Sequence, residues 1–182
     1  MRWTEALGHE VVDTSTAEAV GRVDALVLDP QDSSITAFVI GDQVVSWSDT
    51  GGIGSDAVTI SGSELLRAPR TGTEEGTVDG RARPLSKPIL TEDGYALGEL
   101  NDIEVDPVTG SVQLLITDDD EIAGSRLMGA GSFAVIVSSA SRTSSDGDLD
   151  ALTKTELYEL ARDRDIDGRS NMTKDQLLDA LG

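Results

Sequence analysis

Residues that commonly carry enzymatic chemistry are few in this chain, and they do not form a recognisable catalytic constellation. The only histidine is His9, and a general base needs a positioned partner that the sequence does not reveal. No serine stands in a Gly-x-Ser-x-Gly turn between a strand and a helix. The glycine-rich run 51–54 lacks the lysine of a phosphate-binding loop. We therefore expect no catalytic residues, no enzymatic activity and no cofactor.

Two acidic runs could bind a cation. Residues 118–121 read Asp-Asp-Asp-Glu, and residues 146–150 read Asp-Gly-Asp-Leu-Asp. Neither run has the ligand spacing and the closing glutamate of a calcium-binding loop. The chain has no cysteine that could supply a thiolate ligand. We expect no metal site and interpret both runs as charged loops.

Basic residues near the C-terminus are the candidate contacts with a binding partner. These are Arg162, Arg164, Arg169 and Lys174. Acidic residues outnumber basic ones over 150–182, whereas a nucleic-acid module usually has a basic stripe. The formal net charge of the chain is −20, which opposes long-range attraction to nucleic acid or to an anionic membrane surface. We predict contact with an unidentified protein partner, and nucleic acid is the alternative.

The elements that must position these residues belong to an internal repeat. The stretch Gly8–Gly62 aligns with Leu85–Ser139 without a gap. Each copy has about 60 residues, a size at which an isolated hydrophobic core is marginal. We therefore predict that the two copies dock on each other around a pseudo-twofold axis. The chain would then be a monomer or a weak dimer.

Short apolar runs within each copy predict strands. In the second copy, residues 100–105 and 112–117 flank an Asp-Pro turn that ends at Gly110, which is typical of a β-hairpin. Between the copies, residues 70–80 are rich in Gly, Thr and Glu and have no apolar period. This composition predicts a flexible, exposed linker.

The pattern becomes helical after the second copy. Thr153-Lys154-Thr155-Glu156 and Thr173-Lys174-Asp175-Gln176 both have the sequence of a capping box. They predict two helices, over about 153–164 and 173–181.

The repeat resembles the PRC-barrel, a family named for the cytoplasmic part of the photosynthetic reaction centre H subunit. The family also forms the C-terminal domain of a ribosome maturation factor. Each copy has an apolar-Gly-x-apolar opening, an Asp-Pro hairpin and a closing Gly-x-x-Ala-Val. The openings are Val20-Gly21-Arg22-Val23 and Leu97-Gly98-Glu99-Leu100, and the closings are Gly54-Ser55-Asp56-Ala57-Val58 and Gly131-Ser132-Phe133-Ala134-Val135.

The unit 150–182 resembles the helix–extended-loop–helix module at the N-terminus of transcription termination factor Rho, which is related in shape to SAP and LEM modules. The matching residues are Leu157-x-x-Leu160-Ala161 and Ile166-x-Gly168-Arg169-Ser170-x-Met172-x-Lys174-x-x-Leu177. The resemblance implies that Gly168 makes a turn and that Ile166 and Met172 are core residues. Some relatives bind nucleic acid and others bind proteins.

Together these resemblances imply a mainly β protein of two tandem small PRC-type β-barrels followed by a small two-helix SAP/LEM-like module. The barrels would span 1–68 and 85–139, joined by a linker over 69–84, and a second linker over 140–149 would precede the module. The expected function is that of a non-enzymatic protein-interaction adaptor or scaffold, and an RNA- or DNA-associated factor is the alternative. The N-terminus lacks the order of a signal peptide, and no apolar run approaches the roughly 20 residues of a membrane span. We therefore expect a cytoplasmic location.

Overall fold

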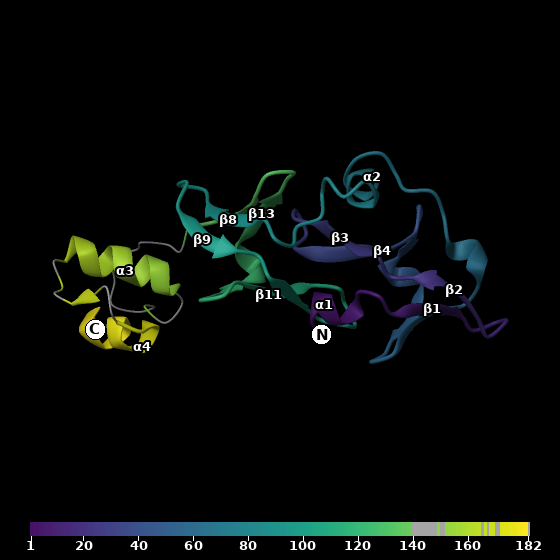
Figure 1. Ribbon diagram of the computed structural model, residues 1–182, viewed down its shortest axis with the longest axis horizontal. Coiled ribbons are helices and arrows are strands. Elements are labelled where there is room, and N and C mark those ends of the chain that lie inside the picture. Colours follow the sequence, from purple (N-terminus) through teal and green to yellow (C-terminus); the bar gives the residue numbers. More distant parts are fainter. Residues whose placement is uncertain (140–148, 150–151, 165, 167, 170–171, 182) are drawn as a thin grey trace.

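The computed structural model describes residues 1–139, 149, 152–164, 166, 168–169 and 172–181. The described chain is mainly β, with four small sheets and two helices near its C-terminal end. This confirms the predicted class at that level. The helical unit, the second copy and the first copy follow one another along the long axis (Figure 1). None of the described helices is long and apolar enough to cross a membrane.

Seven strands build the first copy and form two sheets. They are β1 (Glu10–Asp13), β2 (Glu18–Arg22), β3 (Ala25–Asp29), β4 (Ser34–Ile40), β5 (Gln43–Ser46), β6 (Thr50–Ile53) and β7 (Ala57–Ile60). One sheet has the order β2-β1-β7-β6 and the other has the order β3-β4-β5. Strands β1 and β7 pair in parallel, and the other pairs are antiparallel. Two 3₁₀ turns, η1 (Trp47–Asp49) and η2 (Ser63–Leu65), follow β5 and β7.

The second copy has the same strand order. Its strands are β8 (Pro88–Thr91), β9 (Ala96–Glu99), β10 (Asp102–Val105), β11 (Val112–Ile116), β12 (Glu121–Ala123), β13 (Leu127–Ala130) and β14 (Val135–Val137). They form the sheets β9-β8-β14-β13 and β10-β11-β12. The 3₁₀ turn η3 (Gly124–Arg126) stands where η1 stands in the first copy.

The copies share their irregularities as well as their strand order. The β3–β4 bulge at 27/28 falls on the β10–β11 bulge at 104/105 when the repeats are aligned. The first strand of each copy differs from this pattern. The bulge of β1 is at 11/12 and that of β8 is at 89/90, whereas the gapless alignment would place the β8 bulge at 88/89. The gapless alignment expected from the sequence is therefore wrong at this strand. The turn that follows β8 is effectively one residue shorter than the turn that follows β1.

One hydrophobic core cluster contains buried side chains of both copies. Leu26, Phe38 and Trp47 belong to it from the first copy, and Ile103 and Leu115 belong to it from the second. The rings of Phe38 and Trp47 stack with centroids 5.1 Å apart and an interplanar angle of 10°. Because this cluster is continuous between the copies, their cores support each other.

Backbone hydrogen bonds also join the copies. The Ile35 N–H donates to the Gly110 carbonyl at 2.8 Å, and the Val112 N–H donates to the Ser33 carbonyl at 2.8 Å. Ile35 aligns with Val112 and Ser33 aligns with Gly110, so the two bonds are related by a pseudo-twofold axis. Gly110 has φ +76°, and Ser33, at the same place in the first copy, has φ +45°. The serine thus takes the left-handed conformation that the turn requires, although no glycine is present.

The N-terminal segment packs on the second copy. The sequence did not predict its short helix, α1 (Trp3–Ala6), in which Trp3 is buried in the shared core. The Met1 ammonium group donates to the Val105 carbonyl at 3.0 Å, and the Val105 N–H donates back to Met1 at 2.8 Å. Thr4 Oγ1 donates to Asp102 at 2.6 Å. The start of the chain thus pairs with the edge of β10.

Residues between the copies form regular structure where the sequence predicted a flexible linker. Helix α2 (Thr73–Val78) covers the outer face of β3 and β4 (Figure 1). Val78 packs there against Val27, Val39 and other residues of a second apolar cluster. The helix is short and uses a single apolar contact, so it leaves no periodic pattern in the sequence.

The C-terminal unit contains helices α3 (Lys154–Asp163) and α4 (Lys174–Leu181). The predicted capping box of α3 is confirmed, because Thr153 and Glu156 exchange hydrogen bonds. Thr173 and Gln176 do the same before α4. The buried core of this unit consists of Leu157, Ala161, Leu177 and Leu181, with Ile166 and Met172 packed against it. The expected linker over 140–149 lies almost entirely outside the described residues.

Candidate functional site

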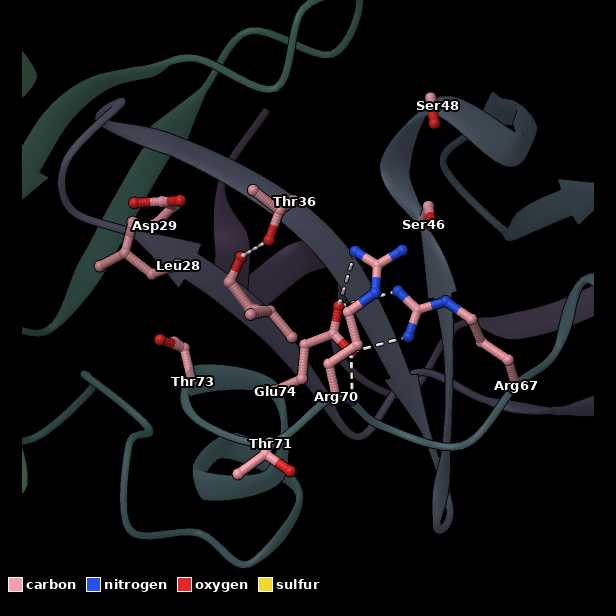
Figure 2. Close-up of a pocket in the computed structure, with 11 residues that line it drawn as sticks. Leu28, Asp29, Thr36, Ser46, Ser48, Arg67, Arg70, Thr71, Thr73 and Glu74 are labelled. Atoms are coloured by element: carbon pink, nitrogen blue, oxygen red, sulfur yellow. Dashed lines mark hydrogen bonds and ion pairs between the residues drawn. The ribbon is translucent and has the colours of Figure 1, made fainter.

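A pocket of about 480 Å³ lies between the outer face of the β3-β4-β5 sheet and the segment that leads into α2 (Figure 2). Its lining is mostly polar. The lining residues are Val27, Leu28, Asp29, Thr36, Ser46, Ser48, Arg67, Arg70, Thr71, Thr73 and Glu74.

The lining of this pocket contains an ion pair. Arg67 donates from Nη1 and Nη2 to the two carboxylate oxygens of Glu74, at 2.7 and 2.8 Å. The Arg70 N–H donates to the same carboxylate at 2.6 Å, and Glu74 keeps only 11% of its side chain exposed. Hydrogen bonding from Arg67 holds the pKa of Glu74 below its usual range despite burial, and the same bond raises the pKa of Arg67. The pair fastens α2 over the sheet.

The pocket has the character of a structural cavity. The guanidinium groups of Arg67 and Arg70 both turn towards Glu74 (Figure 2), and Asp29 adds a second carboxylate. Positive charge is therefore balanced within the lining. The hydroxyls of Ser46 and Ser48 have no histidine or lysine beside them in the lining that could act as a base. This arrangement can bind small polar molecules but has no activated nucleophile.

The structure gives individual roles to the four basic residues that sequence analysis selected. Arg162 pairs with Glu159 at 2.6 Å. Arg164 donates to the Leu181 carbonyl at 2.7 Å, and Arg169 donates to the Ile166 carbonyl at 2.8 Å. Arg164 and Arg169 thus hold the helical unit together. Lys174 is the first residue of α4 and is half-buried.

His9 and the two acidic runs, which the sequence offered as candidate sites, also have defined surroundings where the structure describes them. His9 immediately precedes β1, and its backbone bonds Ala6 and Val23. In the run 118–121, Asp118 accepts from Asn101 and Asp120 accepts from the Lys154 N–H. Most of the run 146–150 lies outside the described residues. No group of three or more metal-ligating side chains occurs in the part of the chain that the structure describes.

Sequence analysis missed the contacts that attach the helical unit to the second copy. Arg126 donates to Glu156 at 2.7 Å, and the two side chains are only 13% and 17% exposed. Asp120 accepts at 2.8 Å from the backbone of Lys154, at the start of α3. Burial raises the pKa of Glu156, but hydrogen bonds from Arg126 and Thr153 prevail and hold it below the usual value. Nothing in the local sequence links these residues, because the partners lie far apart along the chain.

An apolar row crosses the outer face of the β9-β8-β14-β13 sheet. Gly129, Ile136, Leu90 and Ala96 are successive partners across the four strands. The alternate residues of β8 and β14 belong to the buried core, so the row faces away from it. Met128, in the bulge beside Gly129, is 52% exposed, and Tyr95, next to Ala96, is 47% exposed. We call Leu90, Ala96, Ile136, Met128 and Gly129 the apolar row.

The same surface of the first copy is more polar. Thr59 stands in the place of Ile136, Gly51 in the place of Met128, and Glu18 in the place of Tyr95. Two more exposed apolar residues of the second copy also have polar counterparts. Val108 corresponds to Gln31, and Phe133 corresponds to Asp56. All the large apolar side chains that are exposed in the described chain therefore belong to the second copy. A residue-by-residue comparison of the two copies would have identified these apolar residues from the sequence, but not the face that they share.

No protein-family model matches this sequence, and no curated protein matches it.

Proposed function

We propose that this chain is a non-enzymatic protein-interaction adaptor built on two docked PRC-type barrels with an attached helical module. The apolar row carries the proposal. The two copies have the same strand order and nearly the same bulges, yet only the second exposes large apolar side chains within the described chain. Exposed apolar surface is costly unless a partner covers it, and clusters of it mark interaction sites.

The arrangement of the sheets supports the barrel part of the proposal. Each copy has a four-stranded and a three-stranded sheet, and its first and last strands pair in parallel. Such an order suits a small closed sheet, because the terminal strands are brought together. The motifs that resemble the PRC-barrel lie on the β2, β3–β4 and β7 strands and on their equivalents.

The helical unit would provide a second contact point. Arg126 and Asp120 attach it beside the second copy, so a partner bound to the apolar row would lie close to it. Two linked binding sites raise the effective concentration of one partner near the other. The adaptor would thus bring two partners together on one chain.

The nucleic-acid alternative has less support. Arg164 and Arg169 donate to carbonyls of their own unit, and Arg162 pairs with Glu159. Phosphate contact would have to compete with these bonds and with a net charge of −20.

Affinity capture with the full chain tests the adaptor function. The full chain is incubated with cell extract and cross-linked to the proteins that it contacts. The captured proteins are then quantified by mass spectrometry. An unrelated acidic protein of similar net charge serves as the control for non-specific capture. We expect at least one protein to be enriched over this control. If none is enriched, the adaptor function is wrong.

A further inference from the structure

Three exposed carboxylates lie on the β8–β9 hairpin, which also carries Leu90 and Ala96 of the apolar row. Glu92 and Asp93 lie in the turn between β8 and β9, and both are exposed. Glu99 is also exposed and pairs with Pro88. Because Pro88 stands two positions before Leu90 on β8, Glu99 borders the same face of the sheet. Glu92 and Asp93 accept hydrogen bonds from Ser139. Within the described chain, none of these three carboxylates belongs to an ion pair.

The first copy has neither feature at the equivalent places. Thr14 and Ser15 stand where the second copy has Glu92 and Asp93, and Arg22 stands in place of Glu99. Arg22 is paired with Glu10 at 3.1 Å. At the positions of Met128, Ile136, Glu92, Asp93 and Glu99, the second copy therefore has both the apolar and the acidic side chains, and the first copy has neither, although it has Glu18 in the place of Tyr95. A shared ligand explains this joint difference better than general surface acidity does.

The acidic border argues against a second copy of this chain as the occupant. In a symmetric dimer through this face, each border would approach an equally acidic chain, and like charges in contact are unfavourable. A partner with Lys or Arg beside its apolar residues would instead meet opposite charge.

The width of this face favours a helix as the partner's binding element. Four strands present a surface about 14 Å wide, and a helix with its side chains is about 10 Å across. A partner strand would add to a sheet edge, but the apolar row crosses the sheet on its face. Helix α2 already covers the outer face of the β3-β4-β5 sheet in this chain, so the fold accommodates a helix packed on a sheet.

We propose that the apolar row of the second copy binds a cationic amphipathic helix of a partner protein, with Glu92, Asp93 and Glu99 contacting its basic residues. The inference rests on the proposed adaptor function and specifies the chemistry of one of its partners.

Two synthetic peptides of one length test this inference on the full chain. One has leucine at positions i, i+3, i+4 and i+7 and lysine elsewhere, and the other has glutamate in place of each lysine. Binding is measured by fluorescence anisotropy at low and high salt. We expect the chain to bind the leucine–lysine peptide, more weakly at high salt, and not the leucine–glutamate peptide.

Variants that carry the residues of the first copy locate the site. Met128→Gly with Ile136→Thr should weaken binding of the leucine–lysine peptide by about tenfold or more, because the peptide would lose two apolar side chains that it buries on binding. Glu99→Arg should weaken binding and reduce its salt dependence. Val108→Gln is the matched control, because it removes an exposed apolar side chain outside the row and should leave binding unchanged. Circular dichroism checks that each variant is folded, and the single Glu99→Arg change remains informative if the double variant is not.

Several results would overturn the inference. Equal binding by the double variant and the unchanged chain would mean that the peptide binds the acidic surface non-specifically. Equal binding of both peptides would exclude a cationic partner. Dimerisation of the unchanged chain in sedimentation, lost in the double variant, would assign the row to a second copy. If the double variant still captures the same proteins from extract, the adaptor function is retained, but the apolar row is not the site that binds them.

Discussion

Ser34 and Ser111 form an antiparallel bridge between the two copies and occupy equivalent places in the repeat, so they lie on the pseudo-twofold axis. Hydrogen bonds on either side of them join the β3–β4 turn to the β10–β11 turn. Separating the copies would break these bonds and expose the shared core. Folding of one copy is therefore coupled to folding of the other.

Gly110→Ala tests this contact. A Cβ at Gly110 would lie 2.8 Å from the Ile35 carbonyl oxygen and 3.1 Å from the ring of Trp47, and the residue has φ +76°. Gly94→Ala is the matched control, because Gly94 has φ +86° and no atom lies within 4 Å of the place that its Cβ would take. We expect the control to lose about 1 kcal/mol through backbone strain alone. Gly110→Ala should lose about 2 kcal/mol more through steric conflict, measured by urea unfolding. Equal losses would show that the turn does not pack closely against the first copy.

The two copies should unfold in a single transition. We expect calorimetry of the full chain to show one transition for residues 1–139, because both copies contribute to one core cluster. Amides of α3 and α4 should exchange faster, since the helical unit has its own small core. Hydrogen exchange read by mass spectrometry separates the two regions. Slower-exchanging amides confined to one copy would contradict the coupled core.

Arg126→Gln should loosen the helical unit from the second copy. The substitution leaves the partly buried Glu156 carboxylate without its guanidinium partner, at a cost of about 1–3 kcal/mol. We expect faster exchange in α3 and little change in the strands of the first copy. Arg162→Gln is the control, because it removes an ion pair within α3 that is more exposed than the Arg126–Glu156 pair and contributes only about 0.5 kcal/mol. If both variants change exchange equally, Arg126 does not attach the unit.

Sequence patterns predicted the features that depend on neighbouring residues. The capping boxes before α3 and α4 and the hairpin that ends at Gly110 involve residues only three or four positions apart. Their chemistry is local, so the chain order reveals it.

Features that depend on distant residues were not predicted. Helix α2 exists because Glu74 pairs with Arg67 and Val78 meets the outer face of a sheet. The attachment of Arg126 to Glu156 likewise joins two segments that no motif connects. The apolar row was not predicted, because its members come from four strands and are brought together by register.

Acid should weaken the packing of α2 before it unfolds the rest of the chain. The folded-state pKa of Glu74 is lowered, chiefly by Arg67, so its stabilising contribution is fully present above the unfolded value of about 4.3. The contribution is lost as pH falls from there through the lower folded-state value. We expect Glu74→Gln to be less stable than the unchanged chain at pH 7 and to lose less stability on acidification. Unfolding by urea at pH 7 and at acidic pH compares the two, and a parallel loss in both would mean that Glu74 is not responsible.

Nucleic acid should not bind the full chain in a specific, salt-sensitive way. Affinity for nucleic acid comes largely from basic residues that replace counterions on phosphates. Here Arg164 and Arg169 are used within the helical unit, and the chain as a whole carries −20. We therefore expect no binding of single-stranded RNA or DNA at micromolar concentration, at either low or moderate salt, in a fluorescence anisotropy titration. Micromolar binding that weakens with salt and is lost on Lys174→Glu would contradict this expectation. Such a result would favour the nucleic-acid function, because Lys174 stands at the start of α4 and carries no ion pair within the described chain.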